Sequence, residues 1–248
     1  MYAQEEITPY GQQDGSKRVQ VERMFDEIAH SYDPLNHTLS LGVDRIWRRN
    51  AIRFLQQNAT LPSRHILDVA TGTGDFALLA TEKLNPERVT GIDISEKMMA
   101  IGREKIAKHG FEDIITLKYE DCSRMSFDDN QFDVIISSFG LRNFQDLDKC
   151  LSEMLRVLKP GGMLVAIDLC TPDSFPMKQL FWCYKRVVMP LIGRFISHDQ
   201  HAYTYLPATM DAIPQGEAMV SIFEKAGFEK VRFHRQFLGM SMLYAAVK

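Results

Sequence analysis

The chain has few cysteines, little net charge and no recognisable metal-ligand spacing. Its cysteines, Cys122, Cys150, Cys170 and Cys183, form no Cys-x-x-Cys pair, so the sequence indicates neither a disulfide framework nor a zinc site. We expect no bound metal and a reduced, cytoplasmic setting. The formal net charge of -3 argues against a general nucleic-acid-binding protein.

Long hydrophobic segments are also missing. The most apolar stretch, residues 175–196, is interrupted by four basic residues and a proline, which makes it too broken to span a bilayer. The N-terminus lacks the apolar core of a signal peptide. With 248 residues, 45% of them apolar and 25% charged, the chain is long enough for one domain with its own core.

The N-terminal region divides into a polar segment and two predicted helices. Residues 1–16 have little to bury, so we expect a flexible tail ahead of a single domain over residues 17–248. From Lys17 the apolar residues recur at helical spacing, and a second amphipathic helix is predicted from Asp44. Both precede the first predicted strand, as an N-terminal helical cover.

The rest of the domain alternates short apolar strands with helices. Strands are predicted over residues 65–70, 88–94, 114–121, 132–139 and 162–169, and helices over 75–84, 96–109 and 146–158. Such alternation produces a parallel sheet covered on both faces. After a further helix over 215–226, the strands 230–238 and 242–247 have only a short link, so one must be antiparallel. We predict an α/β, Rossmann-like class I methyltransferase fold, mostly parallel with a C-terminal antiparallel hairpin.

A glycine-containing loop follows the first predicted strand. In Asp68-Val69-Ala70-Thr71-Gly72-Thr73-Gly74, the glycines permit a tight turn and close approach to a ligand. With Asp93 roughly 20 residues further on, the loop also fits a dinucleotide-binding dehydrogenase. A methyltransferase is favoured by the acidic residue before the loop, by the carboxylate of Asp121 after the third strand, and by the C-terminal hairpin.

Polar residues and glycines at the predicted strand ends form a candidate site for S-adenosylmethionine, because ligands bind beyond the carboxyl ends of parallel strands. The predicted cofactor-binding residues are Gly72, Thr73, Gly74, Asp93, Asp121, Cys122 and Ser138. We expect the two glycines to admit the methionine part of the cofactor. Thr73 and Ser138 would complete the pocket near the sulfonium.

The remaining three residues would bind the nucleoside. Asp93 would accept both ribose hydroxyls, and Asp121 with the Cys122 backbone N–H would read the adenine edge. Each residue alone has a structural alternative: Asp93 could cap the helix that begins near Ser95, and Asp121 could be a solvated loop carboxylate. Cys122 is better explained as a small buried residue than as a nucleophile, because no histidine neighbours it.

Three segments resemble signatures of a known family. They are Phe25-x-x-Ile28-Ala29-x-x-Tyr32-Asp33-x-x-Asn36-x-x-x-Ser40-x-Gly42-x-x-Arg45-x-Trp47, Ser138-Phe139-Gly140-Leu141-Arg142-Asn143, and Arg156-Val157-Leu158-Lys159-Pro160-Gly161-Gly162. Over residues 19–248 the chain resembles the menaquinone/ubiquinone biosynthesis C-methyltransferases. The loop departs from that pattern, with Ala70-Thr71-Gly72 where many relatives carry Ala-Gly-Gly or Cys-Gly-Thr.

The resemblance implies methyl transfer from S-adenosylmethionine to a ring carbon of a prenylated demethylquinol, demethylmenaquinol in preference to a ubiquinol precursor. A phenol has a pKa of about 10, so the ring needs a base or a stabilising cation. Arg142, Asn143 and Tyr32 are the candidate catalytic residues: Arg142 would favour the phenolate or act through a water, and Asn143 would orient the ring. Arg142 as a loop ion pair and Tyr32 as a packing residue are the alternatives. His201 is a further candidate, although we interpret it and His198 as solvated.

Other classes of function stay open. A small-molecule O- or N-methyltransferase would share the cofactor residues, and a non-catalytic module would bind the cofactor without transferring methyl. A lipid substrate also predicts reversible contact with the inner face of the membrane. Two basic, aromatic segments suit it: the helix from Asp44, with Trp47, and residues 175–196, with Phe181 and Trp182. The sequence does not indicate an oligomeric state.

Overall fold

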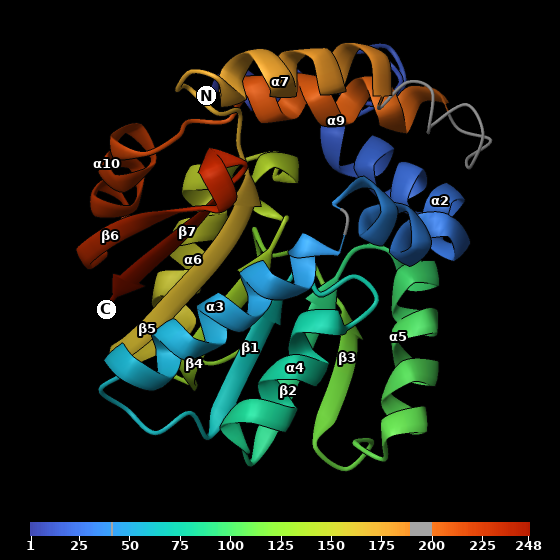
Figure 1. Ribbon diagram of the computed structural model, residues 1–248. Helices are drawn as coiled ribbons and strands as arrows, with labels where there is room; N and C mark the ends of the chain where they lie inside the picture. The colour runs from blue at the N-terminus through green and yellow to red at the C-terminus, as the bar shows by residue number, and fades with distance from the viewer. Residues whose placement is uncertain (41, 189–199) are drawn as a thin grey trace.

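The computed structural model describes residues 1–40, 42–188 and 200–248, and a seven-stranded sheet forms its centre (Figure 1). The strand order is β3-β2-β1-β4-β5-β7-β6. The strands are β1 (His65–Val69), β2 (Arg88–Asp93), β3 (Ile115–Tyr119), β4 (Phe132–Ser138), β5 (Leu158–Leu169), β6 (Glu229–Gln236) and β7 (Ser241–Val247). The first five pair in parallel, whereas β7 is antiparallel to both β5 and β6. The predicted Rossmann-like sheet with its C-terminal hairpin is confirmed.

The strands supply two cores, one on each face of the sheet. Because successive side chains of a strand point to opposite faces, Ile66 of β1 joins the core beneath α3 (Val43–Asn58), α4 (Asp75–Leu84) and α5 (Glu96–His109). Its neighbour Leu67 joins the core beneath α6 (Leu147–Val157) and α10 (Glu217–Lys225). The sheet is therefore covered on both faces, which explains why most residues of its central strands are apolar.

Most predicted boundaries agree with the structure to within a few residues. The helices over 75–84 and 96–109 are confirmed without change, and α5 begins where the Ser95 hydroxyl accepts a hydrogen bond from the Met98 backbone N–H. One strand differs: β5 starts at Leu158, directly after α6, and not at residue 162. The reason is tertiary, because Leu158 pairs with Phe132 of β4. Gly161 and Gly162 then exchange backbone hydrogen bonds with Lys248, at 2.8 and 3.0 Å.

A layer of helices lies over the end of the sheet where the parallel strands finish. It comprises α2 (Lys17–Leu39), α7 (Met177–Cys183) with a helical turn over Tyr184–Val188, and α9 (Gln200–Ala212). In Figure 1, α7 and α9 lie across this end of the sheet, and Phe181 of α7 packs against Met210 of α9. None of the helices in the described ranges is long and apolar enough to cross a membrane.

The first sixteen residues are placed differently from the expected tail. They contain a short helix, α1 (Ala3–Glu6), whose Gln4 is fully buried. The Leu147 backbone N–H donates to the Glu5 carboxylate at 2.8 Å, which fixes α1 against α6. Within this segment Gln4 and Pro9 are buried and residues 11–16 are exposed, so its first part packs on the domain through contacts with elements more than 100 residues away.

Asp68 is a buried carboxylic acid at the centre of the fold. It lies in β1, where Thr71 Oγ1 donates to its Oδ2 at 2.7 Å and its Oδ1 has no hydrogen-bond partner among the described residues. Burial raises the pKa of Asp68 to about 7, and the hydrogen bond from Thr71 opposes that rise. The folded protein thus binds the proton of Asp68 more tightly than the unfolded chain does.

This raised pKa predicts a pH-dependent stability. In the unfolded chain the Asp68 side chain has a pKa of about 3.9. The contribution of protonated Asp68 to the free energy of unfolding is therefore fully present below that pH, and it is lost as the pH rises through the pKa of the folded state. Between about pH 5 and about pH 8, we expect the free energy of unfolding of the wild type to fall relative to that of Asp68→Asn by on the order of 2 kcal/mol. Urea unfolding at both pH values measures this difference, and parallel pH profiles would contradict it.

Candidate active site

Two adjoining cavities lie between the sheet and the helical layer. The strand-end cavity, of about 170 Å³, is lined by the segments that follow β1 to β4 and by α2. The aromatic cavity, of about 300 Å³, lies among α2, α3, α7, α9 and the single turn Leu141–Asn143 that follows β4. Four residues line both cavities: Phe25, Tyr32, Phe139 and Asn143. A molecule in one cavity is therefore separated from a molecule in the other only by these side chains.

Five of the seven residues predicted to bind the cofactor line the strand-end cavity. They are Gly72, Asp93, Asp121, Cys122 and Ser138. They come from the ends of four different strands, so the structure brings together what the sequence separates by more than 60 residues. The convergence at the carboxyl ends of parallel strands is the arrangement in which open α/β sheets bind ligands.

Asp93 both holds the loop and faces the cavity. Its Oδ2 accepts from the Gly72 backbone N–H at 2.8 Å, and its Oδ1 accepts from the Ser95 backbone N–H at 2.9 Å. Burial raises the pKa of Asp93, and these backbone hydrogen bonds oppose the rise. The cap of α5 is Ser95 and not Asp93, because the Ser95 hydroxyl accepts from the Met98 backbone N–H. Each carboxylate oxygen of Asp93 keeps a second lone pair for another donor such as a hydroxyl.

Asp121 is held by a residue that the sequence did not indicate. Its Oδ1 accepts from the Ser123 backbone N–H at 2.8 Å, and its Oδ2 accepts from Arg18 Nε of α2 at 2.7 Å. Burial raises the pKa of Asp121, but the hydrogen bonds from Ser123 and Arg18 outweigh burial, so the pKa lies below its ordinary value. The carboxylate is ionised at neutral pH and accepts hydrogen bonds only.

The chemistry of this cavity fits S-adenosylmethionine. Two carboxylates, Asp93 and Asp121, offer acceptors to hydroxyl and amino groups, while apolar side chains such as Ile92, Ile94 and Met98 form walls against which a flat ring can pack. Gly72 has a φ of +56°, in the left-handed region that glycine adopts without strain. The loop can therefore pass close to a ligand.

Thr73 and Gly74 are predicted cofactor residues that do not line this cavity. Thr73 Oγ1 donates to Asp33 of α2 at 2.8 Å and lies 3.1 Å from Lys105 Nζ of α5. Lys105 also pairs with Asp33 and with Asp75. Thr73 thus ties the loop to the helical cover through its hydroxyl, and its place near the sulfonium stays a prediction. Gly74, with a φ of +77°, begins α4 and lies beside Gly102 of α5.

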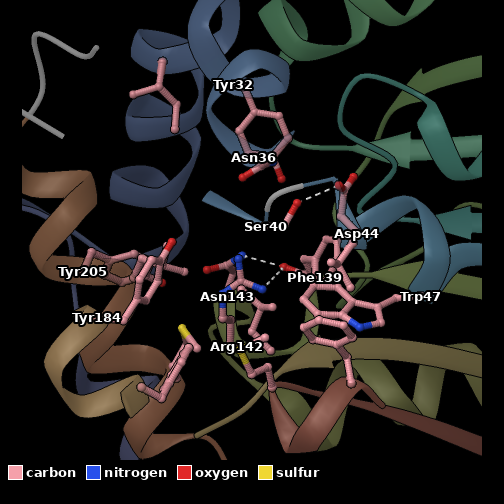
Figure 2. A pocket seen from close by; sticks show the side chains of 18 of the residues that line it. Tyr32, Asn36, Ser40, Asp44, Trp47, Phe139, Arg142, Asn143, Tyr184 and Tyr205 are labelled. Carbon is pink, nitrogen blue, oxygen red and sulfur yellow. Dashed lines mark hydrogen bonds between the residues drawn. The ribbon is translucent and has the colours of Figure 1, made fainter. Parts of the chain in front are cut away.

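The lining of the aromatic cavity is mainly apolar, with Asn36, Ser40 and Asp44 among its polar members. Figure 2 shows Arg142 and Asn143 between Trp47 and Phe139 on one side and Tyr184 and Tyr205 on the other. Arg142 Nε, Asn143 Oδ1 and the Tyr205 hydroxyl are buried without a hydrogen-bond partner among the described residues. Such atoms cost free energy unless a ligand satisfies them. The cavity is therefore suited to an apolar molecule that carries a few oxygen atoms.

Arg142 is fixed in place by a buried ion pair. Its Nη1 donates to Asp168 Oδ1 of β5 at 2.6 Å and to the Phe139 carbonyl at 2.7 Å, and its backbone N–H donates to Asp168 Oδ2 at 3.0 Å. The loop ion pair considered as the alternative is thus present, and Nε still remains for a ligand. Asp168 was not predicted, although an acidic residue in an otherwise apolar strand is a signal that it has a partner.

Tyr32 lies where the two cavities meet. Burial raises the pKa of its hydroxyl, and nearby Arg142 and Asn36 oppose this rise. The phenol is protonated at neutral pH, so Tyr32 is a hydrogen-bond donor and not a base. His198 lies outside the described residues, as does the side chain of His201, so the structure tests neither prediction.

Cys122 and Cys150 are far apart in the sequence but adjacent in the fold. Both line the strand-end cavity, with their sulfur atoms 2.9 Å apart. Burial raises the pKa of the Cys150 thiol, and a hydrogen bond with Cys122 raises it further. A thiol with a raised pKa is a poor nucleophile, so Cys150 is a packing residue beside Cys122.

Comparison with known proteins agrees with this geometry. The model of the ubiE/COQ5 methyltransferase family matches residues 12–248. The chain belongs to this family. It is 54% identical to the demethylmenaquinone methyltransferase of Bacteroides fragilis over 247 residues, covering 100% of this chain and 99% of that relative. It is 41% identical to the protein of the same name from Porphyromonas gingivalis, covering 100% of each.

A solved structure shares the fold of this ubiE/COQ5 family member. The S-adenosylmethionine-dependent methyltransferase of Aquifex aeolicus superposes with a TM-score of 0.55 at 20% identity, covering 79% of this chain and 88% of that one. At this level of identity the agreement concerns the fold alone.

The buried ion pair predicts that stability and activity can be separated. Arg142→Ala leaves the Asp168 carboxylate buried and unpaired, so we expect the free energy of unfolding to fall by about 3–5 kcal/mol. The double variant Arg142→Met, Asp168→Leu removes both charges and should recover most of that stability. Methyl transfer should stay low in both variants, with cofactor affinity little changed. Urea unfolding, calorimetry with S-adenosylmethionine and turnover assays measure the three quantities; an active double variant would show that Arg142 serves only the fold.

Proposed function

We propose that this chain transfers a methyl group from S-adenosylmethionine to a ring carbon of demethylmenaquinol. The observation that carries the proposal is the aromatic cavity, with its unpartnered polar atoms, directly beside the strand-end cavity. A quinol ring with a prenyl chain is largely apolar and carries two oxygen atoms, which matches that lining. The relatives at 54% and 41% identity, both called demethylmenaquinone methyltransferase, support the same substrate.

The strand-end cavity would hold the cofactor through Asp93, Asp121 and the backbone at Gly72 and Cys122. When bound, S-adenosylmethionine supplies an electrophilic methyl group on a sulfonium. Ser138 of β4 lines this cavity close to Phe139 and Asn143, which line both cavities. We therefore place the reacting carbon of the acceptor at this junction. Enclosure by the aromatic side chains excludes water and holds the ring in position.

The polar atoms of the aromatic cavity would activate the ring. Arg142 keeps its positive charge at any physiological pH, and its free Nε–H would donate to a ring oxygen and stabilise the phenolate. Asn143 Nδ2 donates to the Phe139 carbonyl at 3.1 Å, which leaves Oδ1 to accept from the quinol. Tyr32 would donate from the opposite side of the junction. These interactions strengthen as negative charge develops, so they favour the transition state over the ground state.

A reconstituted assay tests the reaction. Reduced demethylmenaquinone in detergent, incubated with enzyme and S-adenosylmethionine, should give menaquinol and S-adenosylhomocysteine in equal amounts, measured by chromatography with mass detection. A ubiquinol precursor and a small phenol serve as the competing acceptors. Faster turnover of the ubiquinol precursor would reassign the quinol, and faster turnover of the small phenol would reassign the chain to the small-molecule methyltransferases.

We further propose reversible contact with a membrane surface, at a different place from the helix that follows Asp44. In α3, Trp47 is only 3% exposed and packs on Phe139, and Arg48 pairs with Asp44. Trp47 and Arg48 are buried in the domain, so the prediction that this part of the helix faces a membrane is wrong. Phe181 is also buried, whereas Trp182 of α7 is 57% exposed.

A set of exposed apolar side chains includes two that line the aromatic cavity. Its members are Phe175, Leu180, Trp182, Phe237 and Leu238, and we call it the rim. Leu180 and Phe237 of the rim also line the aromatic cavity. Arg186 lies over the Trp182 ring at 5.1 Å from its centroid, and Lys178 is exposed beside it. Apolar and basic side chains together suit an anionic lipid interface, from which a prenylated quinol would pass directly into the cavity.

Vesicle flotation tests the rim. The wild type should float with vesicles of anionic lipid at low salt and less at high salt, because salt screens the basic residues. Trp182→Ser with Leu180→Ser should abolish flotation, since both side chains would insert into the interface. Ile46→Ser is the matched control, because Ile46 is exposed on α3 outside the rim. Equal loss of flotation in the control, or no flotation of the wild type with or without substrate, would remove the rim as a membrane contact.

A further inference from the structure

The N-terminal segment lies against the acceptor side of the site, although its sequence suggests a tail. Tyr2 packs on the core beneath α6, and its hydroxyl donates to Asp148 at 2.6 Å. Together with the hydrogen bond from the Leu147 backbone N–H to Glu5, this contact anchors α1 on the first turn of α6. That turn follows the Leu141–Asn143 segment directly, so α1 is anchored next to the loop that carries Arg142.

The chain between α1 and α2 is held as closely as α1 itself. Gln20, a buried residue of α2, donates from Nε2 to the carbonyls of Gly11 and Gly15 at 2.7 and 3.0 Å. Its Oε1 accepts from the Tyr10 backbone N–H at 2.8 Å. One amide side chain thus satisfies three backbone groups and fixes the path of the segment into α2.

Lys17 joins this segment to both sides of the aromatic cavity. Its side chain is buried, with the residue only 4% exposed. Its Nζ donates to the Gln4 carbonyl of α1 at 2.5 Å and to the Arg142 carbonyl at 3.1 Å. The same Nζ lies 5.8 Å from the centroid of the Tyr205 ring of α9. A buried ammonium is stable only where acceptors surround it, so Lys17 holds these three elements together.

We infer that residues 1–17 are a strap that sets the geometry of the acceptor site, with Lys17 as its positioning residue. The inference rests on the proposed function, because it takes the aromatic cavity as the place where the quinol binds. Arg142 and Tyr205 line that cavity and each carries a buried polar atom without a hydrogen-bond partner among the described residues. Lys17 contacts both of them. Neither contact involves a residue that lines the strand-end cavity around Asp93 or Asp121.

The strap therefore predicts a loss that is specific to the acceptor. Lys17→Met removes the three contacts of Nζ while keeping an unbranched apolar side chain. A small displacement of Arg142 or Tyr205 is enough to lower turnover of the quinol, and we expect kcat/KM for the quinol to fall roughly tenfold or more. The dissociation constant of S-adenosylmethionine should stay within about twofold, since the cofactor residues keep their partners. Arg23→Met is the matched control, because Arg23 lies on the same helix with an exposed side chain paired to Glu27.

A second variant separates positioning from folding. Tyr2→Phe combined with Glu5→Ala loosens α1 from α6 but leaves Lys17 in place. We expect the same selective fall in quinol kcat/KM, smaller than in Lys17→Met, at temperatures where both variants are fully folded by circular dichroism. If both variants keep wild-type quinol kinetics, or lose quinol turnover and cofactor affinity together in proportion to lost stability, the strap has no positioning role.

A pH profile provides a readout that a purely structural role would not change. Burial lowers the pKa of Lys17 to about 8, nearby Glu5 of α1 opposes this shift, and Arg142 adds to it. The other groups at this contact are the Tyr205 phenol and Asp168, the partner of Arg142. Because Lys17 loses its proton above about pH 8, the ratio of wild-type to Lys17→Met activity should fall through that pH. A ratio that does not change with pH would contradict a role for the charged form.

Amide hydrogen exchange gives a measurement that needs no substrate. In Lys17→Met, the amides of Leu141–Asn143 should exchange faster than in the wild type, while those of β1 and β2 stay protected. Suppose that Lys17→Met exchanges faster at Leu141–Asn143 but the wild type does not methylate demethylmenaquinol. The contact of the strap with this loop would then be supported, and the proposed function would be overturned. Unchanged exchange at Leu141–Asn143 would overturn the strap, whatever the acceptor.

Discussion

The position of β1 in the sheet is the constraint on which the rest of the structure depends. β1 pairs with β2 on one side and with β4 on the other, so the chain leaves β1 toward one face of the sheet and leaves β4 toward the other. The segments that follow these strands therefore diverge, and a crevice opens between them at the carboxyl edge. Gly72 and Asp93 lie on one side of that crevice and Phe139 and Arg142 on the other. The two cavities follow from this divergence, since the helical layer closes it into the strand-end and aromatic cavities.

The aromatic cavity retains polar atoms that a site built only for stability would not contain. Arg142 Nε, Asn143 Oδ1 and the Tyr205 hydroxyl lack partners among the described residues, and each carries a desolvation cost of about 1–3 kcal/mol. The Arg142–Asp168 pair shows how that cost is contained: Asp168 pairs with the charge and orients the guanidinium, while Nε has no partner among the described residues. Local departures from full hydrogen bonding of this kind are expected at functional sites.

The cover of the site links its two halves through a single helix. α2 pairs with Asp121 through Arg18 at its first turn, and it places Tyr32 further along, where the two cavities meet. Asp33 of the same helix receives the Thr73 hydroxyl from the loop after β1. α2 therefore contributes Arg18, Asp33 and Tyr32 to three different parts of the two cavities and their loops. The strap adds a further constraint, because Lys17 begins this helix.

The sequence alone determined the sheet, most of its helices and the carboxylates at the strand ends. These features depend on local patterns: apolar runs of strand length, helical spacing, caps such as Ser95, and an acidic residue directly after a strand. The predicted helices over 75–84 and 96–109 agree with α4 and α5 for this reason. The family signatures likewise lie in continuous segments, so the resemblance to the quinone C-methyltransferases was visible without the fold.

Only the tertiary structure decided the direction and the partners of the side chains. Thr73 follows a glycine in the expected loop, yet it faces Asp33 and Lys105 because α2 and α5 pack beside that loop. Trp47 and Trp182 each lie among basic and apolar residues in the sequence. Trp47, on α3, is buried against Phe139, whereas Trp182, on α7, is exposed. Asp168, Tyr205 and Lys17 acquire their roles from contacts with residues distant in the chain. Spacing along a sequence carries no information about which distant backbone a side chain will meet, and packing alone decides that.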